Sequence, residues 1–364
     1  MGGPAPRGRA GGHRWRPLAA AAVVAAGLAA PTAASAQTTG PPTTVAMPPA
    51  RAAILVDVDT GKVLYESNAH TPLPPGSLTK TLTAMIAYDW LAPGAQVPVS
   101  PVAADVYPDR VGMKAGQLWP LDTTLHALIT DSANDAAYAL AEDIGGSLAG
   151  FAPIMETAAH QIGMVDHPTL EDPAGLDGSI GFDGGNLISA WDMAVAGRDM
   201  MANPDLAAIA ALRTYDFTGP DGIDYHLVSR NYHFLATYPG AIGVKTGFTD
   251  RAGYCDMEEA QAGGRRMLAV VLASPNPDAV AADLITAGFQ QAPGGEGASP
   301  SLPPVAEPHP PEPPPPPTTT TDPKLVAEVN RGGPASSAWR AVGGTAVVLG
   351  IVALTWFWRV RRPG

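Results

Sequence analysis

The spacing of apolar residues changes from strand-like to helix-like and back again between residues 46 and 292. Two apolar runs, residues 52–58 and 62–67, lie on either side of Asp59-Thr60-Gly61, which is typical of a β-hairpin. Apolar residues at helical spacing follow, and further short apolar runs joined by turns come later. The predicted helices are residues 77–91, 121–130, 135–144, 148–162, 187–201 and 279–290, and the later strands are residues 241–247, 253–260 and 265–273.

This order of strands, helices, strands and a last helix predicts an α+β fold over residues 46–292. Because the first and last strands belong to one continuous domain, we expect them to share one antiparallel sheet that is flanked by helices. The helices between them would form an inserted all-helical lobe. A cleft between the lobe and the sheet is then the expected position of a functional site.

The N-terminal residues have a different pattern. Basic residues precede an apolar run over residues 18–30, and Ala34-Ser35-Ala36 supplies the small residues of a cleavage site. Residues 1–36 are therefore predicted to be a signal peptide. An uncleaved anchor is the alternative, and the shortness of the apolar run argues against it.

Near the other end, residues 341–358 carry no charged side chain. A helix of about 18 residues spans roughly 27 Å, which is enough for the core of a bilayer. Three of the last six residues, 359–364, are arginines, which predicts a basic cytoplasmic tail. The Pro/Thr-rich residues 293–338 predict an extended stalk. We therefore expect a single-pass membrane protein whose folded domain is extracytoplasmic.

Composition narrows the classes of function. The net charge is −12, and basic residues gather at the two ends, so the sequence does not predict a nucleic-acid partner. Cys255 is the only cysteine, which excludes an intramolecular disulfide, and we expect it to be a small buried strand residue. The eight histidines lack the spacing of a zinc site, so no metal or cofactor is expected.

Candidate chemistry begins with Ser77-Leu78-Thr79-Lys80 at the start of a predicted helix. Residues three apart share one face of a helix, so the hydroxyl and the amine can meet. A lysine held neutral can take the proton of a serine and activate it as a nucleophile, whereas arginine stays protonated. Taken alone, this pattern is more often a helix cap with a solvated lysine.

Two further motifs follow in the chain. Ser132-Ala133-Asn134 lies between two predicted helices, where a hydroxyl and an amide could relay a proton and hold a substrate amide, or could simply cap a helix. Lys245-Thr246-Gly247 comes at a strand end, where a cation and a hydroxyl could bind a carboxylate and glycine would allow close approach. A β-turn with a surface lysine is the alternative for this third motif.

The three motifs together, in this order, resemble those of the serine-type D-alanyl-D-alanine carboxypeptidases, which are the low-molecular-mass penicillin-binding proteins of peptidase family S11. The resemblance covers residues 50–290 and includes the loop of residues 171–178, EDPAGLDG. It implies a sheet domain with an inserted helical lobe. Gly76 and Ala133 depart from the alanine and glycine usual in the family.

The resemblance also implies roles. Ser77 would form the acyl-ester and Lys80 would be its general base, kept neutral, we expect, by nearby Lys245. Ser132 would assist proton transfer to the leaving group, and Asn134 would position the substrate. Lys245 and Thr246 would bind the terminal carboxylate, and Gly247 would allow the ligand backbone to approach closely. The backbone N–H groups of Ser77 and Phe248 would stabilise the oxyanion.

By the same resemblance, the substrate would be a peptidoglycan stem peptide ending in D-Ala-D-Ala, and β-lactams would acylate the same serine. The reaction would belong to cell-wall synthesis and remodelling. Two alternatives stay open. One is a serine β-lactamase, in which Glu171 would drive deacylation. The other is a non-catalytic, membrane-anchored wall-binding protein.

Overall fold

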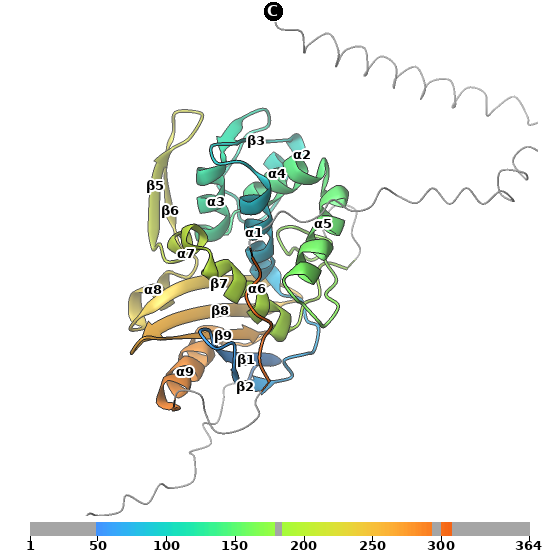
Figure 1. Ribbon diagram of the computed structural model, residues 1–364. Coiled ribbons are helices and arrows are strands. Elements are labelled where there is room, and N and C mark those ends of the chain that lie inside the picture. The colour runs from blue at the N-terminus through green and yellow to red at the C-terminus, as the bar shows by residue number, and fades with distance from the viewer. Residues whose placement is uncertain (1–48, 179–183, 293–299, 308–364) are drawn as a thin grey trace, which may run out of the picture. The chain divides into compact units, whose positions relative to one another are not determined.

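The computed structural model describes residues 49–178, 184–292 and 300–307 (Figure 1). The predicted signal peptide, membrane helix and basic tail lie outside these residues. Within the described ranges, no helix is long and apolar enough to cross a membrane.

Over the described residues, one antiparallel sheet has five strands, in the order β2-β1-β9-β8-β7. Its strands are β1 (Ala52–Asp57), β2 (Val63–Ser67), β7 (Ala241–Thr249), β8 (Gly253–Ala262) and β9 (Arg265–Leu272). Ala52 of β1 pairs with Leu272 of β9, so the first and last strands of the domain are neighbours. This pairing confirms the shared antiparallel sheet, and the strand order places β7 at one edge.

Helices cover both faces of this sheet (Figure 1). The helices are α1 (Lys80–Trp90), α2 (Pro101–Asp105), α3 (Leu121–Thr130), α4 (Asn134–Gly145), α5 (Leu148–Gln161), α6 (Ala190–Ala202), α7 (Pro204–Ala210), α8 (Tyr232–Thr237) and α9 (Pro277–Gln290). Alternate residues of β1 point to opposite faces, since Leu55 packs with Leu284 of α9 while Ile54 joins the core with the inserted helices. The predicted α+β fold, an antiparallel sheet with an inserted helical lobe, is confirmed, although short strands also pack in that lobe.

Two small two-stranded sheets in the described part were not predicted from the sequence. They pair β3 (Gln96–Pro98) with β4 (Leu118–Pro120), and β5 (Thr214–Thr218) with β6 (Asp224–Val228). Aromatic packing holds the β5–β6 hairpin against the lobe. Phe217 stacks on Tyr225 with ring centroids 5.0 Å apart, and both rings meet Trp119 edge-on.

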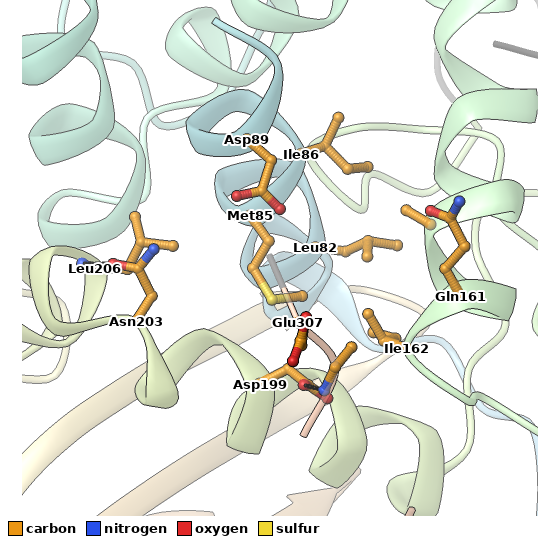
Figure 2. Close-up of a pocket in the computed structure, with 12 residues that line it drawn as sticks. Leu82, Met85, Ile86, Asp89, Gln161, Ile162, Asp199, Asn203, Leu206 and Glu307 are labelled. Carbon is orange, nitrogen blue, oxygen red and sulfur yellow. Dashed lines mark hydrogen bonds between the residues drawn. The ribbon is translucent and has the colours of Figure 1, made fainter. Parts of the chain in front are cut away.

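Residues 300–307, which the sequence analysis placed in the stalk, pack against the domain instead. Leu302 is buried, its backbone N–H donates to the carbonyl of Gly61 at 2.9 Å, and Ala306 N–H donates to the Asp199 carboxylate at 2.6 Å. The domain therefore extends past residue 292. Ala306 also lines a cavity of about 60 Å³ between α1, α5 and α6 (Figure 2), and none of the predicted site residues lines that cavity.

Candidate active site

Ser77 lies on a 3₁₀ turn, η1 (Gly76–Thr79), that is pressed against the edge strand β7. A side-chain Cβ at Gly247 would approach the Ser77 backbone nitrogen to 3.0 Å. Gly76 has φ +56, a left-handed conformation that disfavours other residues, and a Cβ there would lie 3.2 Å from the Phe248 nitrogen. Glycine at both positions thus allows backbone-to-backbone contact between the serine turn and the strand.

Lys80 begins α1 one turn after the serine and is completely buried. Its Nζ lies 2.8 Å from the Oγ of Ser77 and 3.0 Å from the carbonyl oxygen of Ala174. The predicted serine–lysine contact is therefore present, and it is made inside the protein rather than by a solvated side chain.

Burial is the main reason that the pKa of Lys80 lies well below its ordinary value, and the charge of Lys245 is the next cause. Asp172 opposes both by favouring the protonated amine. Lys245, which we expected to keep Lys80 neutral, does lower its pKa, but desolvation contributes more. A neutral amine within hydrogen-bond distance of the serine hydroxyl can act as its base.

The loop of residues 171–178 holds the amine from the other side. Asp172 is buried and accepts from the backbone N–H groups of Ala174 at 2.8 Å and Leu176 at 3.0 Å, and from the Tyr138 hydroxyl at 2.7 Å. The side chain of Asn186 fixes the start of the loop by accepting from the Asp172 N–H at 2.9 Å. This network directs the Ala174 carbonyl toward Lys80, and the sequence analysis did not identify Asn186 or Tyr138.

The second motif borders the same region. Ser132 has φ +62 and lies in the break between α3 and α4. The Asn134 side chain donates to the carbonyl of Pro108 at 2.6 Å, while its Oδ1 is buried without a hydrogen-bond partner among the described residues. That free acceptor can receive an N–H from a ligand, since a buried acceptor left unsatisfied is costly.

The third motif places a cation beside the strand edge. Lys245 is buried and its Nζ donates to the carbonyl of Thr246 at 2.8 Å. Burial, and next the charge of Arg230, lower the pKa of Lys245 to about 7, although Asp256 opposes this shift. Lys245 is therefore protonated in only part of the molecules at neutral pH.

Arg230 is a site residue that no sequence motif indicated. It donates from Nε to the Asp131 carboxylate at 3.1 Å and from NH2 to the Asp109 carboxylate at 3.2 Å. These two contacts hold the guanidinium beside Ser132 and Thr246, with which it lines one cleft. It supplies a second cation close to Lys245.

Ser77 lies where two clefts meet in the described part of the chain. The first, here called the Thr246 cleft, has a volume of about 420 Å³ and runs from Ser77 past Ser132 and Thr246 to Asp256 and the start of α9. The second, the Asn134 cleft, has a volume of about 390 Å³ and runs from Ser77 past Asn134 to the loop at Asp177. Phe248 lines both. The predicted site residues are thus brought together, with Lys80 and Lys245 buried beneath the surface.

This arrangement has counterparts in known proteins. The peptidase S11 family model, D-alanyl-D-alanine carboxypeptidase, matches residues 36–276, which is more than half of the chain. The chain belongs to the D-alanyl-D-alanine carboxypeptidase family. The motif-based resemblance to this family is thereby confirmed.

Individual members of the family are similar to this chain in sequence and in structure. The chain is 31% identical over 235 residues to D-alanyl-D-alanine carboxypeptidase DacF of Bacillus subtilis, in an alignment that covers 63% of this chain and 58% of DacF. It is 34% identical over 224 residues to DacB2 of Mycobacterium tuberculosis, covering 62% and 75% of the two chains. The crystal structure of a D-alanyl-D-alanine carboxypeptidase from M. tuberculosis superposes with a TM-score of 0.64 at 30% identity, over 71% and 98% of the chains.

Glu171, the residue that a β-lactamase would need, does not line either of the two clefts. Its backbone N–H donates to Asn186 at 2.7 Å, and its Oε2 is buried without a hydrogen-bond partner in the described part of the chain. Glu171 therefore helps to hold the loop that contains Asp172, and it is not part of the surface around Ser77.

We predict that Lys245→Ala lowers kcat/KM for peptides with a free terminal carboxylate by about tenfold to a hundredfold, the usual range for a charge-assisted hydrogen bond. In the wild type, kcat/KM for such peptides should fall as pH rises through about 7, because Lys245 loses its proton there. Steady-state rates of the wild type and of Lys245→Ala, measured at about pH 6 and pH 8, would give both the effect of the substitution and the effect of pH.

The matched substrate is the same peptide as its C-terminal methyl ester. Lys245→Ala should change its turnover much less than that of the free acid. Equal losses on the two substrates would contradict carboxylate binding by Lys245.

Proposed function

We propose that this chain is a serine-type D-alanyl-D-alanine carboxypeptidase that removes the terminal D-alanine from peptidoglycan stem peptides. The observation that carries the proposal is the pairing of Ser77 with a buried Lys80, 2.8 Å away, whose pKa is lowered by burial and by Lys245. Membership of the carboxypeptidase family supports the choice of substrate.

In the first step, Lys80 accepts the proton of the Ser77 hydroxyl, and the oxygen attacks the carbonyl carbon of the penultimate D-alanine. The negative charge that develops on the carbonyl oxygen is stabilised by the backbone N–H groups of Ser77 and Phe248. The close contact of η1 with β7 supports this pairing of amides, because Gly76 and Gly247 keep the two backbones together.

In the second step, the peptide C–N bond breaks, and Ser132 relays the proton that Lys80 took from Ser77 to the leaving amine. The departing D-alanine carboxylate is bound by Lys245, Thr246 and Arg230 at the Thr246 cleft. The acyl part of the substrate lies in the Asn134 cleft, where Asn134 accepts a peptide N–H. Water then hydrolyses the ester on Ser77.

β-Lactams would acylate Ser77 as mimics of the D-Ala-D-Ala terminus. The absence of Glu171 from both clefts favours a long-lived adduct over rapid turnover. A purely wall-binding role is less well supported, because a site that only binds its ligand does not require a neutral lysine buried against a serine.

The test is to incubate the purified full-length chain with a pentapeptide that ends in D-Ala-D-Ala and to measure free D-alanine. We expect catalytic release, which stops after addition of a small molar excess of benzylpenicillin. Full activity after rapid consumption of the penicillin would instead indicate a β-lactamase. No D-alanine release, with no penicillin bound, would favour the non-catalytic alternative.

We also propose that residues 1–36 direct export and that residues 341–358 anchor the chain in the bacterial cell membrane, with residues 359–364 inside. The support is the residue pattern of these ranges alone: an apolar run before Ala-Ser-Ala, and an uncharged run before arginines. Deletion of residues 341–364 should release the protein from sedimented membranes, and its retention there would contradict the anchor.

A further inference from the structure

Asp256 is a buried carboxylate in the wall of the Thr246 cleft. It lies on β8 as the cross-strand partner of Thr246, and only 6% of its surface is exposed. Directly opposed residues on one sheet face have Cβ atoms about 5 Å apart, so Asp256 is the nearest neighbour of the proposed carboxylate site on that face. Its position continues the cleft away from Ser77.

Among the buried acids of its strand, Asp256 alone lines the Thr246 cleft, whereas Glu258 Oε1 and both carboxylate oxygens of Glu259 are buried without a hydrogen-bond partner in the described part of the chain. Glu258 accepts from the Asn231 amide at 2.6 Å, and Glu259 lies 3.5 Å from the Arg266 guanidinium. Over the residues that the structure describes, Asp256 has neither a hydrogen bond nor an ion pair. The Asp256 carboxylate borders the cleft and interacts electrostatically with Lys245, so a cation that enters the cleft could form the direct ion pair that Asp256 lacks.

A second carboxylate adds to the negative charge near Asp256. Asp278, in the first turn of α9, lines the same cleft and pairs with His233 at its rim. Burial and the charge of Asp278 raise the pKa of Asp256 to about 7, while Lys245 on β7 opposes that shift. Asp256 can therefore be ionised near neutral pH, and a bound cation would favour its ionised form.

The size of the Thr246 cleft also favours a leaving residue that is larger than D-alanine. A terminal D-alanine presents only a methyl group, yet the Thr246 cleft has a volume of about 420 Å³. With its carboxylate held at Thr246, a leaving residue with a longer side chain could reach Asp256. The amine of a lysine-like side chain would match the charge of this part of the cleft.

We propose that Asp256, with Asp278 at the rim, forms a subsite for a side-chain amine on the residue that leaves, so that the enzyme prefers terminal D-amino acids with cationic side chains. This inference rests on the proposed function. The chemistry is unchanged: the terminal peptide bond breaks, Ser77 takes the acyl group, the leaving amine takes a proton, and water hydrolyses the ester.

The test compares three N-acetylated peptides that end in D-Ala-D-Ala, D-Ala-D-Lys and D-Ala-D-norleucine, with the full-length chain and release of the terminal amino acid as the readout. Norleucine matches the carbon chain of lysine without its charge. We expect kcat/KM for the D-Lys peptide to exceed that for the D-norleucine peptide by about tenfold or more, as for one charge-assisted hydrogen bond.

Asp256→Asn should bring this ratio to about one, since the amide keeps the shape and removes the charge. Comparing two substrates within one variant cancels any effect of the substitution on Lys245. The matched control is Glu258→Gln, which alters a carboxylate of the same strand that does not line the cleft. It should keep the wild-type ratio, and thermal melting would confirm that both variants fold.

The outcomes separate this inference from the function on which it rests. If the D-Ala peptide is cleaved but wild type does not prefer D-Lys over D-norleucine, or Asp256→Asn keeps the preference, the cationic subsite is wrong. If none of the three peptides is cleaved, the proposed carboxypeptidase function itself fails.

Discussion

Replacing Lys80 with methionine is expected to slow acylation of Ser77 by benzylpenicillin by about 10³-fold, within the usual range for the loss of a general base. Methionine has a similar length and can fill a completely buried site, but it cannot accept a proton. Stopped-flow or quenched labelling with a fluorescent penicillin would give the acylation rate constant.

Two comparisons make this result specific. Lys114→Met applies the same change to an exposed lysine that pairs with Asp221, and it should leave the acylation rate unchanged. Lys80→Arg should also fail to acylate, because arginine stays protonated. Wild-type-like acylation in a folded Lys80 variant would remove Lys80 as the base and would direct attention to Ser132.

Replacing Gly175 with alanine is expected to lower the free energy of unfolding by about 3 kcal/mol and to slow acylation at least tenfold, because strain and a steric clash add together. Gly175 has φ +80, and a Cβ there would lie 2.0 Å from the carbonyl oxygen of Gly76. The loop that directs the Ala174 carbonyl to Lys80 would have to move. Urea unfolding and penicillin labelling would measure the two effects.

The matched control is Gly222→Ala in the β5–β6 turn. Gly222 has a similar φ of +75, but no atom lies within 4 Å of the position of a new Cβ. We expect it to cost only about 1 kcal/mol, the strain of the left-handed conformation, with no change in acylation. Equal losses in the two variants would show that the contact between Gly175 and the serine turn does not matter.

Local patterns were enough to predict the parts of the fold in which short-range periodicity and tertiary packing agree. The helix expected at residues 121–130 has the same bounds in the structure, and the hairpin around Asp59-Thr60-Gly61 is present. The order of the three motifs also predicted which residues would meet around Ser77. Spacing of this kind is visible in a sequence because each motif is local.

Features that depend on distant contacts could not be read in this way. Arg230 becomes a site residue only because it pairs with Asp109 and Asp131, which lie about a hundred positions earlier. Residues 300–307 pack on the domain through backbone hydrogen bonds that their composition does not indicate. The importance of burial for the pKa of Lys80 likewise requires the packed structure.

The central claim is that Ser77 is the nucleophile of this site. Its most direct test is mass spectrometry of the intact chain and of its peptides after brief treatment with benzylpenicillin. We predict one penicilloyl group per chain, on the peptide that contains Ser77, and none on the Ser77→Ala variant. An adduct on another residue, or equal labelling of Ser77→Ala, would contradict the assignment.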